Sequence, residues 1–322
     1  MNGFGFLYVN HTNLTRCRSF SKGARAYVAN YSDIWGEIYL YVVNMVQKKP
    51  IVALIYDYDG TLSPGNMQEF GFIQAVGKTA DEFWRMSDSI AIGQDASNVL
   101  SYMKLMFDEA RKNGITLRQE DFRRFGQDIQ LFEGVREWFR LINEYGRKHG
   151  VRIEHYINSS GLKEIIEGSP IAHEFKHIFA GTFIYDDKGE AQWPGIAVDY
   201  TAKTQFLFKI SKGIFSARDN KQVNASMAED KKRIPFTNMI YFGDGDTDVP
   251  CMKIVGMFGG HSIAVYDPGN ERKQATAAKL KRQGRVAFAV PAVYTRDGAA
   301  YRIVTAIIDK IKADWVLSRL SK

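Results

Sequence analysis

A chain of 322 residues is long enough for one large domain with a smaller second one, and its 45% hydrophobic and 25% charged residues are ordinary globular values. This composition excludes a collagen, a coiled coil and a disordered chain. The formal net charge is +7, but residues 1–50 carry more than half of it. The remainder is too small to require nucleic acid as a partner.

The first 48 residues have a mixed polar and aromatic composition without clear periodicity, which predicts a poorly ordered N-terminal extension. They contain neither an apolar run long enough to span a membrane nor the pattern of a secretion signal. The two cysteines, Cys17 and Cys251, offer no disulfide framework. We therefore expect a cytoplasmic protein with no membrane partner.

The first strong structural signal is the apolar run Ile51–Tyr56, which is typical of a strand buried on both faces of a parallel sheet. Asp57 and Asp59 follow it directly, in the sequence Asp-Tyr-Asp-Gly-Thr. Ligands of open α/β sheets bind beyond the carboxyl ends of the strands, where two such acids can serve a cation and a phosphoryl group. Two alternatives are a polar turn and the Asp-x-Asp metal motif of glycosyltransferases.

Helical patterns fill residues 65–130 and predict an inserted helical cap. One helix is expected to end at Asn113-Gly114, and Thr116–Gln119 has the form of a capping box that opens the next. The catalytic core would then comprise residues 49–64 and 131–322.

The chain after the cap alternates between helical and β-prone segments. An amphipathic helix is expected around Trp138, and Phe183–Gly189 has the pattern of a hairpin turn. The further strands are expected at 151–157, 239–242, 262–266 and 287–290. Such alternation predicts an α/β fold with a doubly wound parallel sheet.

A second acidic segment, Gly243–Asp248, follows the expected strand at 239–242. Glycines on both sides of Asp244 let the backbone approach a ligand closely, and carboxylate oxygens suit Mg²⁺. Asp246 lies in the same loop and is expected to be an outer neighbour of the metal rather than a ligand. A solvated turn remains the alternative for this segment.

Two segments between the acidic motifs are candidates for phosphate binding. Ser159, Ser160 and Gly161 follow the expected strand at 151–157 and are expected to open a helix, whose free N–H groups would form an anion site. Serine is also a common N-cap, so this pattern alone decides nothing. Lys203 precedes an amphipathic stretch, and a single lysine there is ordinarily a surface charge.

The order of these four segments resembles the four motifs of the haloacid dehalogenase (HAD) superfamily. The inserted helices and the hairpin resemble its phosphoserine phosphatase-like branch, which has a helical C1-type cap. The resemblance covers roughly residues 51–310 and implies a HAD-like Rossmannoid fold. It also implies a magnesium-dependent phosphohydrolase, that is, a phosphoric monoester hydrolase.

The resemblance implies that Asp57 is the nucleophile and becomes an aspartyl-phosphate. Asp59 would protonate the leaving oxygen and later deprotonate the attacking water. Mg²⁺ would be bound by Asp57, Asp244 and the backbone carbonyl of Asp59, with support from Asp248. Since a halide leaving group needs no acid, Asp59 favours phosphate esters over haloacids.

The same resemblance assigns the phosphate oxygens to Ser159 and Lys203, with Lys203 also neutralising charge beside the nucleophile. Ser160 is an alternative to Ser159, and Gly161 would contribute its backbone N–H. Charged cap residues are candidates for choosing the substrate: Glu69, Arg85, Lys104, Arg123 and Arg124.

We therefore expect a phosphatase that acts on a small phosphorylated metabolite. A phosphotransferase or phosphomutase of the same fold is one alternative, and a non-catalytic module that binds a phosphorylated ligand is another. The sequence leaves the substrate and the oligomeric state open.

Overall fold

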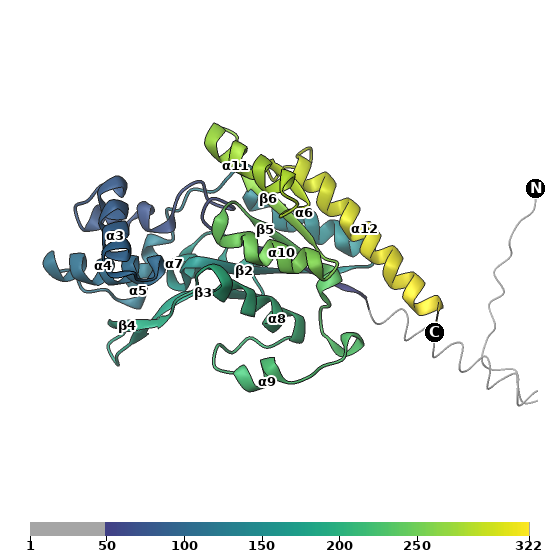
Figure 1. Cartoon of the computed structure of the whole chain (residues 1–322), viewed down its shortest axis with the longest axis horizontal. Helices are drawn as coiled ribbons and strands as arrows, with labels where there is room; N and C mark the ends of the chain where they lie inside the picture. The colour runs from purple at the N-terminus through teal and green to yellow at the C-terminus, as the bar shows by residue number, and fades with distance from the viewer. Residues whose placement is uncertain (1–48, 322) are drawn as a thin grey trace, which may run out of the picture. The chain divides into compact units, whose positions relative to one another are not determined.

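The computed structural model describes residues 49–321, and the predicted N-terminal extension, residues 1–48, lies outside this range. The described chain contains a seven-stranded sheet in the order β4-β3-β2-β1-β5-β6-β7 (Figure 1). All neighbouring strands are parallel except β4, which is antiparallel to β3. The strands are β1 (Ile51–Tyr56), β2 (Arg152–Leu162), β3 (His177–Tyr185), β4 (Ala191–Ile196), β5 (Met239–Gly243), β6 (His261–Tyr266) and β7 (Phe288–Pro291). The predicted doubly wound parallel sheet is confirmed.

The central strand β1 is buried on both faces, as its uninterrupted apolar sequence predicts. Side chains alternate along a strand. Val52, Leu54 and Tyr56 therefore lie in one core, while Ala53 and Ile55 lie in the other. Each core needs its own layer of helices.

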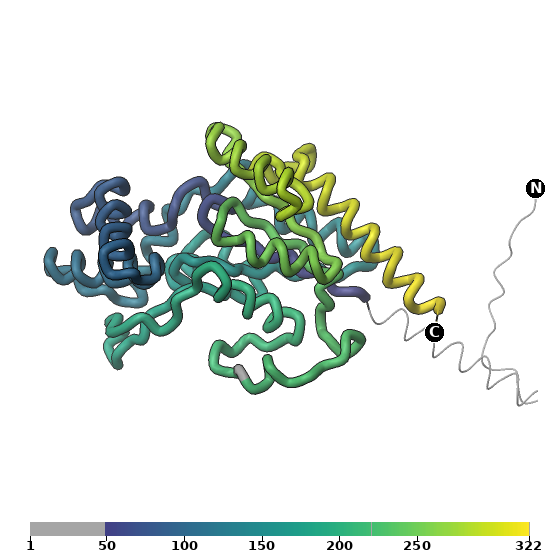
Figure 2. Tube along the Cα trace, viewed as in Figure 1, coloured from purple at the N-terminus to yellow at the C-terminus, as the bar shows by residue number. Residues whose placement is uncertain are grey.

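Two layers of helices cover the sheet. Residues of α6 (Val135–Lys148) and α12 (Ala299–Leu320) belong to the first core, and residues of α8 (Thr204–Lys212), α10 (Val249–Met257) and α11 (Glu271–Arg282) belong to the second. Figure 2 follows the chain through these layers. The sheet is thus enclosed on both faces, and ligands reach it at the strand ends.

The helices predicted for the cap follow β1 in the chain and precede α6. They are η1 (Met67–Phe70), α2 (Phe72–Ala75), α3 (Ala80–Gln94), α4 (Asn98–Lys112) and α5 (Gln119–Phe125). In Figure 1, α3, α4 and α5 gather beside one end of the sheet, near the hairpin of β3 and β4. The domain boundaries at 64 and 130 remain a prediction.

The capping box predicted at Thr116–Gln119 is wrong. Helix α5 begins at Gln119, and Arg118 at its N-cap makes no side-chain capping bond. The preceding segment instead pairs with the hairpin, because Gln119 N–H donates to Gly189 O at 3.0 Å and Arg118 forms a β-bridge with Glu190. Tertiary pairing overrides the local pattern here.

A capping box does open α3. Thr79 accepts a hydrogen bond from the backbone N–H of Glu82, and the Glu82 carboxylate accepts one from the N–H of Thr79. These reciprocal bonds satisfy two donors of the first turn, which fixes the start of a helix that lines the cavity described below.

Residues 159–161 do not open a helix, contrary to the prediction. β2 continues through them to Leu162, with an irregular register against β3 between Asn158 and Leu162, and α7 (Lys163–Gly168) begins after them. The predicted helix N-terminus is therefore not the source of an anion site at these residues.

The remaining short elements connect these layers. They are η2 (Ala172–Glu174), η3 (Tyr200–Lys203), α9 (Asn220–Asn224), η4 (Glu229–Lys231), η5 (Phe236–Asn238) and η6 (Asp246–Asp248). The hairpin predicted near residues 183–189 is confirmed by the antiparallel pairing of β3 and β4. Among the helices of residues 49–321, none has the length and apolarity that crossing a bilayer requires.

Candidate active site

The site lies where β1 ends between its neighbours β2 and β5. Asp57 is the first residue after β1, and its backbone N–H donates to Phe242 O of β5 at 2.9 Å. This bond continues the sheet for one more residue and fixes the Asp57 backbone. β2 and β5 lie on opposite sides of β1, so this is the point at which the strand order reverses and where such sheets bind ligands.

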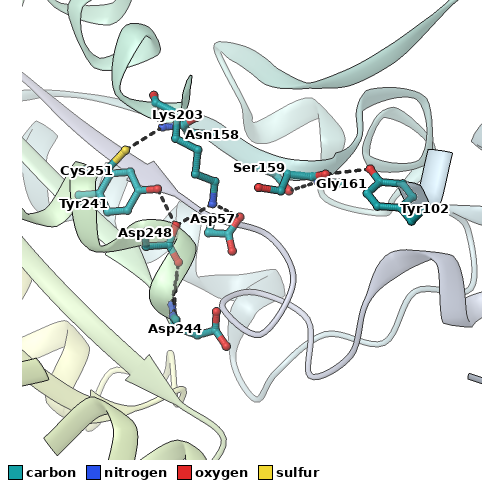
Figure 3. Close-up of polar contacts among 12 residues, drawn as sticks. Asp57, Tyr102, Asn158, Ser159, Gly161, Lys203, Tyr241, Asp244, Asp248 and Cys251 are labelled. Atoms are coloured by element: carbon teal, nitrogen blue, oxygen red, sulfur yellow. Dashed lines mark hydrogen bonds and ion pairs between the residues drawn. The ribbon is translucent and has the colours of Figure 1, made fainter. Parts of the chain in front are cut away.

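A fully buried lysine joins two carboxylates at this point. Lys203 Nζ lies 2.9 Å from Asp57 Oδ1 and 2.7 Å from Asp248 Oδ1 (Figure 3). Burial alone would lower the pKa of Lys203, but Asp248 and Asp57 more than offset it, so the pKa lies above its ordinary value. Lys203 is therefore a permanent positive charge beside Asp57.

The position of Lys203 is set by its backbone. It is the last residue of η3, and its carbonyl oxygen accepts a hydrogen bond of 3.1 Å from Asn158 Nδ2 of β2. The side chain is completely buried, and its ammonium group contacts the carboxylates of Asp57 and Asp248. The sequence pattern gave no sign of this burial.

Asp248 is fixed from three directions. It accepts a hydrogen bond from Tyr241 Oη at 2.8 Å and another from the backbone N–H of Asp244 at 3.2 Å, in addition to the Lys203 contact. The carboxylate is fully buried, so these bonds replace the water it has lost. This arrangement holds the loop after β5 in one conformation.

Asp244 faces the cavity from the same loop. Its Oδ2 lies 2.6 Å from Nζ of Lys273, on α11. On the other side lies Gly60, which has φ +71°, and a Cβ on this glycine would collide with the Asp244 carboxylate. The glycine of the first acidic motif thus allows the second motif to approach it.

Asp57, Asp244 and Asp248 form a group of three buried acids, whose nearest ligand atoms all lie within 4.8 Å of one another. Burial, followed by the charge of Asp248, raises the pKa of Asp57 to about 7, and burial also raises the pKa of Asp244. Crowded carboxylates in this state gain from a hard divalent cation, so the donor set fits Mg²⁺.

The Asp59 carboxylate has different partners from these three acids. Its Oδ1 accepts a hydrogen bond of 2.9 Å from the backbone N–H of Met67, and its other oxygen lies next to Gly161. Its carboxylate is absent from the group of three acids found in residues 49–321, and coordination through its backbone carbonyl remains a prediction. Burial, with the Asp57 charge second, raises the pKa of Asp59 well above its ordinary value.

Gly161 lies beside this acid, and neither Gly161 nor Ser159 opens a helix. Figure 3 shows these two residues at the end of β2. Gly161 N–H donates to Ser159 Oγ at 3.0 Å, so the N–H expected to bind phosphate is already used. A Cβ at position 161 would collide with Met67 and approach Asp59, which explains why this position is occupied by glycine. Within the described part of the chain, Ser160 Oγ has no hydrogen-bond partner.

A cavity of about 510 Å³ connects these residues to the cap helices. The sheet supplies one end of its lining, with Asp57, Asp59, Ser159, Ser160, Gly161 and Asp244. The cap supplies the other end. Lys203 and Asp248 lie behind this lining, where Lys203 contacts both Asp57 and Asp248 without forming the cavity wall. All acids and both serines of the predicted site thus lie in or directly behind one cavity.

Comparison with known proteins identifies the family. The model of the haloacid dehalogenase-like hydrolases matches residues 54–253. The chain belongs to this family. A HAD hydrolase is an enzyme, and residues 54–253 include the site residues named above except Lys273.

Several relatives resemble this HAD hydrolase. An uncharacterized protein of Borreliella burgdorferi is 30% identical over 284 residues, which are 80% of this chain and 96% of that protein. The structure of a HAD family hydrolase from Salmonella enterica serovar Typhi is 14% identical, with a TM-score of 0.53 over 80% of this chain and 72% of that one.

A probable phosphoserine phosphatase from Vibrio cholerae is 11% identical, with a TM-score of 0.50 over 84% of this chain and 69% of that one. At such identities the two structures show a shared fold. This fold agrees with the branch of the superfamily that the sequence resembles.

Several cavity residues of this HAD hydrolase were not predicted. Lys273 lies 29 positions after Asp244, and Gln68, Trp84 and Tyr102 belong to cap elements whose packing no motif describes. Of the charged cap residues proposed to choose the substrate, Glu69 lines the cavity. The other four are absent from its lining: Arg85, Lys104, Arg123 and Arg124. Asp246 is exposed and lies outside the acidic group.

Proposed function

We propose that this HAD hydrolase is a magnesium-dependent phosphatase that hydrolyses a small phosphomonoester through an aspartyl-phosphate on Asp57. The single observation that carries the proposal is the position of the Asp57 carboxylate. It stands at the end of the central strand, borders the cavity, and contacts the buried ammonium group of Lys203. A carboxylate held in this way can attack phosphorus with its charge partly neutralised.

In the first step, an Asp57 oxygen forms a bond to phosphorus while the bond from phosphorus to the ester oxygen breaks. Lys203 offsets the negative charge that gathers on the phosphoryl group, because its ammonium lies 2.9 Å from Asp57. Ser159, with Ser160 as the alternative, would donate a hydroxyl hydrogen bond to a phosphoryl oxygen.

Asp59 gives its proton to the departing alkoxide and later removes one from the water that attacks the aspartyl-phosphate. Two observations support this assignment. Asp59 lines the same cavity as Asp57, and burial raises its pKa above the ordinary value, which favours the protonated form that a general acid requires. The bond from Met67 N–H leaves the second carboxylate oxygen free to act.

Asp57, Asp244 and Asp248, with the backbone carbonyl of Asp59, are the residues that would hold Mg²⁺. When bound, the ion supplies positive charge that orients the phosphoryl oxygens. The chain itself supplies a rigid support, since Asp248 is fixed by Tyr241 and by the loop backbone.

A screen of phosphate release over sugar phosphates, phospho-amino acids, nucleotides and lipid head-group phosphates, each with and without Mg²⁺, tests the proposal. We expect release that requires Mg²⁺ and that is lost in Asp57→Asn. Release that persists in Asp57→Asn would contradict the proposal. Transfer to an added alcohol at the expense of release would instead indicate a phosphotransferase.

We also propose that the substrate is a metabolite of modest size, since the cavity holds about 510 Å³. A cytoplasmic location remains the prediction from the sequence.

A further inference from the structure

The cap end of the cavity has two aromatic walls. Trp84 of α3 and Tyr102 of α4 both line it, with ring centroids 6.0 Å apart and an interplanar angle of 76°. Tyr102 Oη donates to Ser160 O at 2.8 Å, and Trp84 Nε1 donates to Glu69 Oε1 at 2.8 Å. Because the polar atoms of both rings are already bonded, the rings offer the cavity their aromatic surfaces.

The charge at this end is negative. Glu69 and Asp88 line it, and no lysine or arginine within residues 49–321 forms an ion pair with either acid. Lys273 is the cationic residue in the lining, and it pairs with Asp244 at the opposite, sheet end. Glu69 has two neutral donors as partners, Trp84 Nε1 and Asn66 Nδ2.

A buried acceptor adds a third feature. Gln68 is 2% exposed and lines the cavity, and its Oε1 has no hydrogen-bond partner among residues 49–321. A buried amide oxygen without a partner is costly unless a ligand supplies a donor. Gln68 and Glu69 both line the cavity from η1, so a cation with N–H groups that binds there has both as acceptors.

We propose that the leaving group of the substrate is a small alcohol that carries an ammonium group and no carboxylate. This inference rests on the phosphatase function proposed above. Aromatic surfaces attract cations, the Glu69 carboxylate neutralises the charge, and Gln68 accepts an N–H bond. A carboxylate on the same alcohol would meet Glu69 and Asp88 without a free cation to bind it.

The geometry orients such an alcohol. Asp59 accepts a hydrogen bond from the N–H of Met67, the first residue of η1, and Glu69 lies two residues further along η1. Asp59 and Glu69 both line the cavity, so a small molecule can span the general acid and the Glu69 carboxylate. The phosphoryl group would lie at Asp57 and the ammonium between Trp84 and Tyr102.

The test compares kcat/KM of the Mg²⁺-loaded enzyme for four alkyl esters, with p-nitrophenyl phosphate as a reference. The esters are O-phosphoethanolamine, phosphocholine, O-phosphoserine and glycerol 3-phosphate. We expect kcat/KM for O-phosphoethanolamine to exceed the values for glycerol 3-phosphate and O-phosphoserine by about tenfold or more. Phosphocholine, which lacks N–H donors, should fall between O-phosphoethanolamine and glycerol 3-phosphate.

The variant Glu69→Gln removes the charge and keeps an acceptor for Trp84. We expect it to lower kcat/KM for O-phosphoethanolamine about tenfold, mainly through KM, and to lower the ratio of this value to that for glycerol 3-phosphate by a similar factor. Glu120→Gln is the matched control, since Glu120 is an exposed cap carboxylate outside the cavity lining. It should alter neither value.

Trp84→Phe keeps an aromatic ring and removes the N–H that orients Glu69, so it should show a smaller loss for the same ester. Melting curves of each variant exclude unfolding as the cause.

If p-nitrophenyl phosphate is cleaved but neither O-phosphoethanolamine nor phosphocholine is preferred over glycerol 3-phosphate, the inference is overturned and the phosphatase function stands. If no ester, p-nitrophenyl phosphate included, is cleaved with Mg²⁺, the proposed function itself fails.

Discussion

The two ends of the cavity differ in how their charges are held. At the sheet end, Asp57, Lys203 and Asp248 are buried and joined by contacts of 2.7 and 2.9 Å, so each charge has a fixed partner. At the cap end, Glu69 is partly exposed and has neutral partners, and Asp88 is exposed. The fixed and neutralised charges of the sheet end are suited to the reaction, which the members of a family share. The acids of the cap end, which lack a cationic partner in the described chain, are suited to selecting a substrate.

The largest expected effect lies at the sheet end. Asp57→Asn removes the attacking oxygen charge but keeps the shape of the side chain. We expect turnover to fall below about 1% of wild type, because an amide is a much weaker nucleophile than a carboxylate. Phosphate-release assays measure this, and circular dichroism checks that the fold is retained. Activity of Asp57→Asn near the wild-type level would show that Asp57 is not the nucleophile.

Lys203→Met should affect both activity and stability. The methionine fills a similar volume, but it leaves Asp57 and Asp248 without their buried counter-charge. Breaking a buried ion pair typically costs about 3–5 kcal/mol, so the urea midpoint should fall substantially. Lys104→Met is the control, since Lys104 pairs with Asp108 on an exposed face. The same loss in both variants would contradict the distinction between buried and exposed pairs.

Asp59→Asn should slow the enzyme in a way that depends on the leaving group. A p-nitrophenolate leaves without much protonation, whereas an alkoxide needs a proton. We therefore expect a loss of about 10²-fold or more for an alkyl phosphate and a smaller loss in aspartyl-phosphate formation from p-nitrophenyl phosphate. Burst-phase kinetics separate the two steps. Equal losses for both esters would argue against the acid role of Asp59.

The metal-free protein should lose stability as the pH rises. The pKa of Asp57 is about 7 in the folded chain, because burial and then Asp248 raise it above its ordinary value near 4. Between these values the folded state binds more protons than the unfolded state, so this residue's contribution to stability falls as the pH rises from about 4 to about 7. Melting temperatures with a chelator should decline less over this range in Asp57→Asn.

Lys273→Gln is expected to have the smallest effect of these changes and to act on metal affinity. The Lys273 ammonium lies 2.6 Å from Asp244, so it competes with a cation for that carboxylate. Without it, the Kd for Mg²⁺ measured by calorimetry should fall about threefold to tenfold. The control is Asp246→Asn, in the exposed part of the same loop, which should leave Kd within about twofold. Weaker Mg²⁺ binding in Lys273→Gln would reverse this interpretation.

The sequence predicted the sheet end of the cavity well. The run Ile51–Tyr56 specified a doubly buried strand, and the structure has β1 at the same residues. Because parallel strands end at one edge, the positions of Asp57 and Asp244 after two such strands were sufficient to bring them together. Local sequence patterns were therefore sufficient to predict that Asp57 and Asp244 lie close together.

The other features of the fold and the site depend on contacts between elements that are distant in the sequence. β2 runs on past Asn158 and pairs with β3 again at Leu162, after an irregular register at residues 159–161, and residue 118 is extended where it pairs with the hairpin. The Lys273 contact requires the packing of α11 against the sheet. The walls formed by Trp84 and Tyr102 likewise require two helices to pack side by side. Sequence patterns describe single elements, so such pairs cannot be read from them.

The most direct test of the central claim is to find the phosphoryl group on the protein. The Mg²⁺-loaded enzyme is mixed with p-nitrophenyl phosphate, quenched in acid within the first turnover, and digested for mass spectrometry. We predict one added phosphoryl group on the peptide containing Asp57, specifically on that residue, and none when a chelator is present. Phosphate release with no phosphoryl group on Asp57, or with the group on another residue, would contradict the mechanism.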